Sequence, residues 1–424
     1  MRPPGSKSLT NRELIIAALA AGETTLVGGL HSDDTRVMID ALRMIGIRID
    51  APEDKDRWKI DPVGRAAPSH EIPTKIEVGN SGTTIRFLTA ALTAVGGHYR
   101  LVGVDRMHQR PIGDLVEALM PVIKGNVITE SPRGCPPVRI RSKGWTDKPI
   151  RVAGIVSSQY LSGLMMAAGM SDRPKRIDYT GELVSLPYVE MTATVMAAAG
   201  ARVDPMENGW TVCGPYRGGC REIEPDASAA TYAMAAAAMT GTRVRIRGLR
   251  RDALQGDVGF ADVLTRLGCE VRFDDDGIVV DGPDAYPGID VDMNAISDTV
   301  QSLAPVALFA RSPTRIRGVA HNRFKETDRI GDLARELRRV GAEVTEHEDG
   351  MTIHPIADVD TSDAGQTPPV RLRTYDDHRM AMGLSLIGLR RPNTFVKDPA
   401  CTAKTYPNFW FDLERIIGRP LRWA

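Results

Sequence analysis

The sequence has few of the features that mark secreted, membrane or metal-binding proteins. Its five cysteines are scattered and form no Cys-x-x-Cys pair, which argues against a disulfide framework or a zinc site and for a reducing compartment. Lys and Arg total 54, and so do Asp and Glu, so no overall charge attracts nucleic acid or an acidic membrane. No apolar run is long enough to cross a bilayer. We therefore expect a cytoplasmic protein without nucleic-acid or membrane partners.

Two motifs near the N-terminus are incomplete. The segment 5–8, Gly-Ser-Lys-Ser, resembles the end of a P-loop, but it lacks the adjacent Gly-Lys pair and the glycine five residues earlier. Basic residues before the apolar run at 14–21 imitate a secretory signal, but polar residues interrupt the segment. Neither nucleotide hydrolysis nor secretion is indicated.

What the sequence does have is an internal repeat. The 424 residues suffice for two or three domains, and a helical pattern followed by Gly and a strand-like step recurs at intervals of roughly 70–80 residues. Pro121 is expected to end the second of these helices early. The pattern predicts six α/β units. The six copies lie at 37–46, 115–125, 189–200, 260–268, 330–341 and 409–418.

A grouping of three units and three units places a domain boundary near residue 225. A helix pattern that starts at Asp226 or Ser228 follows this point directly. We therefore predict an α/β protein of two domains, each built of three repeated units, that face each other across a cleft. The predicted domains are 6–225, and 1–5 together with 226–424.

The chain is organised around the segment 4–12. A turn at 4–5 and a capping-box pattern at 10–13 predict a loop that delivers Lys7 and Ser8 to the start of a helix. Helix starts offer free N–H groups and a positive dipole end, and Lys7 and Arg12 add charge. The segment therefore predicts a phosphate or carboxylate site. The alternative is a solvated helix start with two surface cations.

Similar polar helix starts recur along both halves of the chain. Each one alone fits an ordinary helix cap with solvated charges. Their distribution over both halves favours two anion-binding half-sites instead. They lie at 79–86, 157–160, 322–329, 376–379 and 397–405.

Taken together, these motifs resemble those of the EPSP synthase family, the 3-phosphoshikimate 1-carboxyvinyltransferases. The resemblance implies two domains of three α/β units each, in agreement with the repeats. It also implies transfer of the enolpyruvyl group of phosphoenolpyruvate to the 5-hydroxyl of shikimate 3-phosphate, with release of phosphate by addition and elimination. This reaction belongs to chorismate and aromatic amino-acid biosynthesis. The matching segments are 4–12, 32–35, 79–83, 106–112, 157–160, 255–257, 292–298, 325–329, 377–382 and 401–404.

The resemblance further implies a monomer that works without metal or organic cofactor. Both substrates are polyanions, so many cations and hydroxyl groups are expected around them. For shikimate 3-phosphate the implied residues are Lys7, Ser8, Arg12, Ser157, Ser158, Gln159, Ser185, Tyr188, Asp298, Asn322 and Lys325. For phosphoenolpyruvate they are Lys7, Asn80, Gly82, Arg110, Gln159, Arg329, Arg379 and Lys404.

The implied catalytic residues are Asp298, Glu326, Lys7 and His378. Asp298 matches the residue that takes the proton from the attacking hydroxyl, and Glu326 matches the residue that exchanges a proton with the methylene carbon. Two carboxyl groups with opposite tasks need environments that separate their pKa values. From the residues alone, Asp298 could instead cap a helix, and Glu326 could be an intrahelical partner of Arg329.

Two other functions were weighed. The sister enzyme that acts on UDP-N-acetylglucosamine usually carries a Cys in the loop that corresponds to 106–110, where this chain has Met-His-Gln. A non-catalytic paralogue would be expected to lose a proton-transfer or phosphate-facing residue, and none is lost. The family also usually has a strand before the segment 4–12, so either the start was placed late or the C-terminal domain lacks an edge strand.

Overall fold

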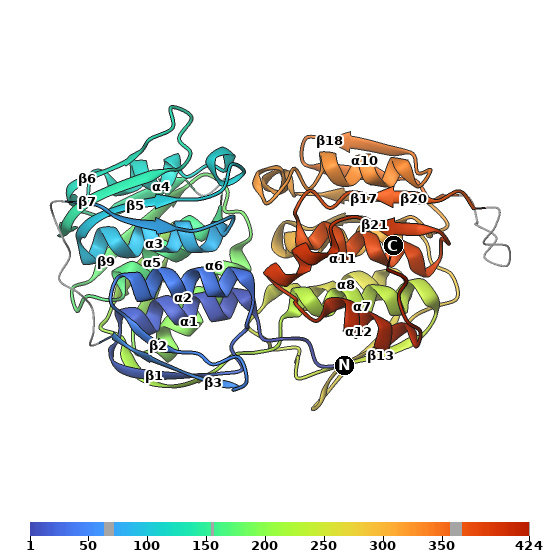
Figure 1. Ribbon diagram of the computed structural model, residues 1–424, viewed down its shortest axis with the longest axis horizontal. Helices are drawn as coiled ribbons and strands as arrows, with labels where there is room; N and C mark the ends of the chain where they lie inside the picture. Colours follow the sequence, from blue (N-terminus) through green and yellow to red (C-terminus); the bar gives the residue numbers. More distant parts are fainter. Residues whose placement is uncertain (63–71, 154–156, 357–366, 424) are drawn as a thin grey trace. The chain divides into compact units, whose positions relative to one another are not determined.

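A computed structural model describes residues 1–62, 72–153, 157–356 and 367–423 of the protein (Figure 1). The chain divides into two compact units. We call Gly5–Ile223 the continuous unit, and Met1–Pro4 with Glu224–Ala424 the split unit. Each unit is described by itself below.

The continuous unit contains three four-stranded sheets with mixed parallel and antiparallel pairing, in the orders β12-β1-β3-β2, β4-β5-β7-β6 and β10-β11-β9-β8. Their apolar faces pack on helices in the interior of the unit. The strands are β1 (Ala21–Val27), β2 (Arg48–Asp50), β3 (Arg57–Asp61), β4 (Thr74–Glu77), β5 (Gly97–Val102), β6 (Ile123–Thr129), β7 (Val138–Trp145), β8 (Ile150–Ala153), β9 (Lys175–Thr180), β10 (Arg202–Met206), β11 (Gly209–Cys213) and β12 (Arg217–Glu222).

Three central helices of this unit, α1 (Lys7–Leu19), α3 (Gly82–Val95) and α5 (Ser158–Ala168), pack on one another. They are buried on nearly all sides because sheets or other helices cover each face. Figure 1 shows α1 beside β1 and β3, and α3 beside β5 and β7. The remaining helices are α2 (Asp33–Met44), α4 (Gly113–Leu119) and α6 (Leu186–Ala198).

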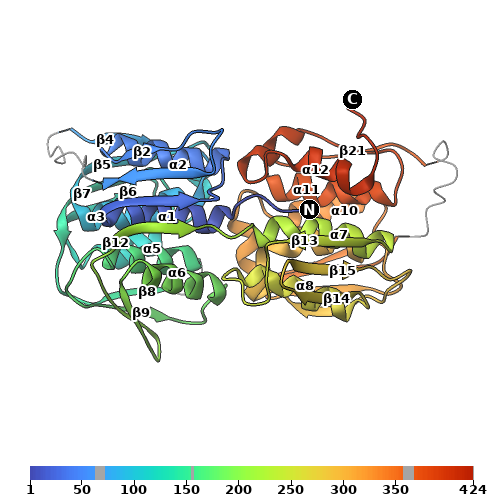
Figure 2. The same cartoon turned by 90° about the horizontal axis from the view of Figure 1, so that it is seen from below.

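The split unit repeats this plan with smaller sheets, ordered β13-β15-β14, β16-β17-β19-β18 and β20-β21. Its central helices are α7 (Ala227–Thr240), α9 (Val300–Ala307) and α11 (His378–Leu386), which pack together. Figure 2 shows α7 against the sheet of β13 and β15. The strands are β13 (Arg243–Arg247), β14 (Glu270–Asp274), β15 (Gly277–Asp281), β16 (Asp290–Asp292), β17 (Thr314–Arg317), β18 (Val344–His347), β19 (Gly350–Ile353), β20 (Val370–Leu372) and β21 (Thr394–Val396), and the outer helices are α8 (Phe260–Arg266), α10 (Gly331–Arg339) and α12 (Phe409–Ile417).

All the predicted repeat helices are present, as α2, α4, α6, α8, α10 and α12. The glycine that follows the helix pattern has a φ between 67° and 100° in every copy except the second, which is the left-handed region where only glycine is unstrained. In the second copy the expected early end of the helix at Pro121 is confirmed, so Gly125 does not follow the helix directly. There α4 ends at Leu119, before Pro121, and Gly125 lies in β6 at a register shift.

The first four residues belong to the split unit through backbone hydrogen bonds. The Met1 amino group donates to the Arg245 carbonyl at 2.6 Å, and the Arg247 N–H donates to the Met1 carbonyl at 2.8 Å. The Pro4 carbonyl accepts from the Asp226 N–H at 2.8 Å, just before α7. Met1 therefore lies along β13, and Pro4 lies at the start of a central helix.

Candidate functional site

Helix α1 begins at Lys7, so Lys7 and Ser8 are its first two residues. The predicted capping box at 10–13 is wrong, because Ser6 is the cap and its Oγ accepts from the Leu9 N–H at 3.4 Å. Thr10 lies inside the helix and donates to the Ser6 carbonyl at 2.7 Å. Lys7 is thus the first residue of the helix, whereas Arg12 lies in its second turn.

The other central helices of the continuous unit also start at serines. Ser81 caps α3 by accepting from the Thr84 N–H at 3.2 Å, and Ser157 caps α5 by accepting from the Gln159 N–H at 3.3 Å. The starts of these two helices meet, because Gln159 Nε2 donates to Thr83 Oγ1 at 3.3 Å. Free N–H groups and positive dipole ends are therefore concentrated in one place, which suits an anion.

Arg12 joins α1 to α5 and α6. It donates through Nε to Thr192 Oγ1 at 2.7 Å, and through Nη2 to Ser162 Oγ at 3.3 Å and to the Tyr188 carbonyl at 3.1 Å. Its Nη1 donates to the Ser8 carbonyl at 3.0 Å. Burial lowers the pKa of Arg12 to about 10, so the side chain stays charged at neutral pH. The predicted residues Ser8, Arg12 and Tyr188 are thus brought together.

Gly82, the first residue of α3, is surrounded by two guanidinium groups. A Cβ built on Gly82 would lie 2.6 Å from Arg86 Nη1 and closer still to Arg110 Nη2. Arg110 donates to the carbonyl and side-chain oxygens of Asn80 at 2.9 and 3.2 Å. The structure therefore groups the predicted residues Asn80, Gly82 and Arg110. Arg86 was not predicted, although its position one turn after Gly82 on the same helix was a usable signal.

Ser157 and Ser158 lie at the start of α5, and Ser185 precedes α6. Ser185 has a φ of 54°, in the left-handed region, and its carbonyl accepts from the Tyr188 N–H at 3.1 Å. A non-glycine residue in this conformation is uncommon and is often found at functional sites. The α6 start is linked to α1 through Tyr188 and Arg12.

In the split unit, the predicted residues gather around Arg329, which is almost fully buried. Arg329 donates to Asp377 at 2.7 and 3.1 Å, to Glu326 Oε2 at 2.8 Å and to Asp298 Oδ1 at 3.2 Å. Burial alone would lower the pKa of Arg329, but the three carboxylates outweigh it and raise the pKa above its ordinary value. One guanidinium therefore holds both carboxylates that were expected to move protons.

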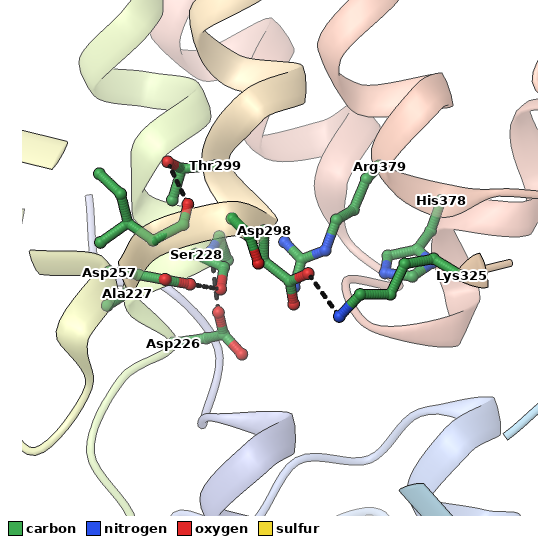
Figure 3. A network of polar contacts seen from close by, with 12 residues as sticks. Asp226, Ala227, Ser228, Asp257, Asp298, Thr299, Lys325, His378 and Arg379 are labelled. Carbon is green, nitrogen blue, oxygen red and sulfur yellow. Dashed lines mark hydrogen bonds and ion pairs between the residues drawn. The ribbon is translucent and has the colours of Figure 1, made fainter. Parts of the chain in front are cut away.

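Further cations surround Asp298 and Glu326. Arg379 Nη2 lies 2.8 Å and Lys325 Nζ 3.6 Å from Asp298, and Lys404 Nζ lies 3.0 Å from Glu326. Figure 3 shows the side chains of Arg379 and Lys325 directed toward Asp298. Charge-assisted pairs of this kind, largely shielded from water, are stronger than exposed ones. A continuous series of ion pairs thus links five of the predicted residues of this unit: Asp298, Glu326, Arg329, Arg379 and Lys404.

Asp298 lies in a 3-10 segment, Asn294–Thr299, that runs into α9. The cap position of α9 is Thr299, which makes no side-chain cap hydrogen bond, so the helix-cap alternative for Asp298 was wrong. Glu326 does pair with Arg329 three residues later, but the segment between Phe324 and Gly331 is not helical. The intrahelical alternative for Glu326 was therefore wrong as well.

Asn322 and His378 complete the group in the split unit. Asn322 Nδ2 donates to the Ser297 carbonyl at 2.9 Å and so supports the segment that carries Asp298. His378 is the first residue of α11 and is fully buried, and neither of its ring nitrogens has a hydrogen-bond partner among the described residues. Burial, followed by the nearby Arg379, holds the pKa of His378 well below its usual value, so the ring is neutral at physiological pH.

Asp257 is a buried carboxyl group that the sequence analysis did not single out. It accepts a short hydrogen bond from Ser228 at the start of α7. Figure 3 shows this pair beside Asp298. Burial, with a contribution from Asp298, raises the pKa of Asp257 to about 6. Its place in the segment 255–257 was the only signal in the sequence.

Across residues 1–62, 72–153, 157–356 and 367–423, no group of three or more His, Cys, Asp or Glu side chains is arranged to hold a metal ion. The clustered carboxylates of the split unit face arginine and lysine instead. The same part of the chain contains no helix that is long and apolar enough to span a membrane.

Comparison with known proteins decides the family. The EPSP synthase (3-phosphoshikimate 1-carboxyvinyltransferase) family model matches residues 1–413. The chain belongs to the EPSP synthase family. The 3-phosphoshikimate 1-carboxyvinyltransferase of Sulfurovum sp. is 41% identical over 423 residues, which cover 97% of this chain and 95% of the relative. The relative of that name from Nostoc punctiforme is 41% identical over 413 residues, covering 96% and 93%.

Solved structures agree on the fold. EPSP synthase from Acinetobacter baumannii superposes with a TM-score of 0.77 at 24% identity and covers 98% of this chain and 95% of its own. The enolpyruvyl transferase NikO from Streptomyces tendae gives a TM-score of 0.74 at 18% identity, covering 98% and 94%. The predicted two-domain enolpyruvyl-transferase fold is confirmed, and the protein is an enzyme of the 3-phosphoshikimate 1-carboxyvinyltransferase class. The alternative that acts on UDP-N-acetylglucosamine is not favoured.

Proposed function

We propose that the protein transfers the enolpyruvyl group of phosphoenolpyruvate to the 5-hydroxyl of shikimate 3-phosphate and releases inorganic phosphate. The single observation that carries the residue assignment is the grouping of Asp298 and Glu326 on the buried guanidinium of Arg329. A reaction that adds a hydroxyl across a double bond and then expels phosphate needs two positioned proton carriers. Family membership supports the reaction class, and we assign the two proton carriers to Asp298 and Glu326.

The proposed reaction has an addition step and an elimination step. Asp298 takes the proton of the 5-hydroxyl as its oxygen forms a bond to C2 of phosphoenolpyruvate, while Glu326 gives a proton to the methylene carbon, which becomes a methyl group. In the second step the bond from C2 to the phosphate oxygen breaks, Glu326 takes a proton back from the methyl group, and the proton held by Asp298 passes to the departing phosphate. Because the carboxylates are attached to different atoms of one guanidinium, they stay separate and in fixed positions.

Charge stabilisation comes from the cations of both units. In this proposal Arg329, Arg379 and Lys404 bind phosphoenolpyruvate on the split unit, and Lys325 and Asn322 bind shikimate 3-phosphate. The neutral, buried His378 offers a ring nitrogen to the substrate. Preorganised donors of this kind stabilise charge that develops during reaction. On the continuous unit, Lys7, Asn80, Gly82, Arg110 and Gln159 bind phosphoenolpyruvate, and Lys7, Ser8, Arg12, Ser157, Ser158, Gln159, Ser185 and Tyr188 bind shikimate 3-phosphate.

The test is an assay of phosphate release with both substrates and with each left out in turn. We expect release only when both are present, with a product heavier than shikimate 3-phosphate by one enolpyruvyl group in mass spectrometry. Activity should survive EDTA, because the proposed chemistry uses side chains alone. Release from phosphoenolpyruvate alone would show a phosphatase, and turnover with UDP-N-acetylglucosamine would identify the sister enzyme; either result would contradict the proposal.

We further expect the protein to act as a cytoplasmic monomer without nucleic-acid or membrane partners. The balanced charge of 54 basic and 54 acidic residues supports this expectation. Size-exclusion chromatography with light scattering would test the expected monomeric state, and a mass of twice that of the chain would contradict it.

A further inference from the structure

Arg86 lies one turn into α3 and is 5% exposed. Its Nη1 donates to Gln159 Oε1 at 2.8 Å, and its Nη2 donates to the Pro111 carbonyl at 3.0 Å. Its guanidinium carbon lies 5.5 Å from the ring centroid of Tyr160, whose hydroxyl donates to the same Pro111 carbonyl at 2.7 Å. Arg86 thus joins α3, the start of α5 and the loop that follows Arg110.

The contact with Arg86 fixes which way the Gln159 amide faces. Arginine has only donors, so the atom of Gln159 that meets it must be the oxygen. The NH2 group then points the other way, where one N–H bonds Thr83 Oγ1 at 3.3 Å. Nε2 has no second partner among the described residues, so its other N–H remains available to a ligand.

The ligand that this N–H suits is an anion. Gln159 Nε2 bonds Thr83, the residue after Gly82, and guanidinium atoms of Arg86 and Arg110 lie where a Cβ on Gly82 would clash with them. The start of α3 adds N–H groups and a positive dipole end. With its oxygen in the same place, Gln159 would direct partial negative charge at the anion, which would weaken binding.

We propose that Arg86 is a positioning residue that holds the Gln159 amide with its NH2 group toward the anion at the start of α3. This inference rests on the proposed function, because the anion is phosphoenolpyruvate. Arg86 acts through Gln159 and the adjacent loop and need not touch the substrate. A purely structural role, in which Arg86 only ties α3 to α5, is the competing explanation.

A double-mutant cycle separates these explanations. We expect Arg86→Met and Gln159→Ala each to lower kcat/KM for phosphoenolpyruvate by about 10- to 100-fold, the range of one charge-assisted hydrogen bond. If Arg86 acts through Gln159, the double variant falls no more than about threefold below Gln159→Ala. Losses that multiply would overturn the inference. Arg100→Met is the matched control, because Arg100 lies on β5, outside the site, and pairs with Glu130. This substitution should leave kcat/KM unchanged.

Two further variants guard against misfolding and test the role of charge. Gln159→Glu keeps an acceptor for Arg86 but has no NH2 group, so it should lose binding as Gln159→Ala does, without a lower Tm. Arg86→Lys keeps the charge, but lysine cannot present a planar fork to two acceptors, so it should lose activity as Arg86→Met does. Wild-type affinity in Gln159→Glu, or wild-type activity in Arg86→Lys, would overturn the inference.

Equilibrium binding of phosphoenolpyruvate, measured by calorimetry on the same variants, keeps the inference distinct from the proposed function. If the wild type binds phosphoenolpyruvate without turning it over and the variants show the non-additive pattern, the positioning role stands and the transfer reaction falls. If turnover is normal and the binding losses multiply, the reaction stands and the positioning role falls.

Discussion

The buried arginines of the candidate site have different partners in the two units. In the continuous unit, Arg12 and Arg86 donate to carbonyl, hydroxyl and amide oxygens, all of them neutral. In the split unit, Arg329 and Arg379 donate to carboxylates. The first arrangement leaves positive charge for an incoming anion, whereas the second balances its charge internally and supplies groups that can carry protons.

The pKa values follow this difference. Within the part of the chain that the structure describes, Arg12 pairs with no carboxylate, and burial lowers its pKa to about 10. Arg329 is equally buried, yet its pKa is raised because three carboxylates surround it. A buried charge that lacks a counter-ion is destabilising until a ligand supplies one. From this comparison we propose that the continuous unit mainly captures the anion and that the split unit transfers protons.

The largest effect is expected from Glu326→Gln, which removes a proton carrier from the split unit. Turnover should fall by about 10²- to 10⁴-fold, the usual contribution of general acid–base catalysis, while KM changes little because the amide oxygen can still face Arg329. Steady-state kinetics measures both. Glu336→Gln is the control: Glu336 is buried in the same unit but accepts from Tyr375. Unchanged turnover in Glu326→Gln would remove the proton-transfer role from the split unit.

A smaller loss is expected from Gly82→Ala in the continuous unit. The new Cβ would push the tips of Arg110 and Arg86 away from the start of α3, so the KM for phosphoenolpyruvate should rise about 10- to 100-fold. Gly219→Ala is the control for an added methyl group, since nothing lies within 4 Å of its Cβ position, although its φ of 156° borders the strained region. If the KM of Gly82→Ala matched that of the wild type, the anion would not bind at this helix start.

The pH dependence of the free energy of unfolding should reveal the buried carboxyl group of Asp257 in the split unit. The native pKa of Asp257 is about 6, against an ordinary value of 3.8, so the native state binds this proton more tightly than the unfolded state. The resulting stabilisation is complete below about pH 4 and is lost as pH rises through 6, a change of about 2–3 kcal/mol.

Asp257→Asn removes this titration. Urea unfolding at pH 4, 5, 6 and 7 should show the variant gaining free energy of unfolding relative to the wild type as pH rises. Asp262→Asn, at an exposed site on α8, should show no such trend. Parallel pH profiles for wild type and Asp257→Asn would mean that Asp257 is ionised throughout.

The smallest effect, and the most direct test of the comparison, is expected from Asp298→Asn. Arg379, Arg329 and Lys325 would lose a shared counter-ion, so the split unit would become more like the continuous unit. Affinity for inorganic phosphate should rise about 3- to 10-fold in calorimetry, even though turnover falls. Asp290→Asn, which affects an exposed pair with Arg317, serves as control. Weaker phosphate binding in Asp298→Asn would contradict the interpretation that the carboxylates of the split unit balance the charge of its arginines and lysines.

Local sequence pattern was enough to predict the repeated helices, because each has its own apolar spacing and all but α4 are followed by a glycine that ends them. It also located the polar starts of the central helices. It did not predict that Ser6 rather than Thr10 caps α1, since several residues in that stretch could serve as a cap.

Long-range partners could not be read from the sequence. Arg12 bonds Thr192, which is 180 residues away, and Arg86 bonds Gln159, which is 73 residues away. Arg329 meets Asp377 only because α11 packs in the same core. Such pairs depend on how the sheets and helices assemble, so the sequence could suggest the nearby pair of Arg329 with Glu326 but not its pairs with Asp298 and Asp377.

The interrupted path of the split unit has a consequence for synthesis on the ribosome. Residues 1–4 emerge before the continuous unit, but their partners Asp226, Arg245 and Arg247 follow more than 220 residues later. At 5–20 residues per second that delay is roughly 10–50 s. All residues of the continuous unit have been translated before then, so this unit is free to fold cotranslationally. Residues 1–4 can form their hydrogen bonds only after Asp226 and β13 have been translated.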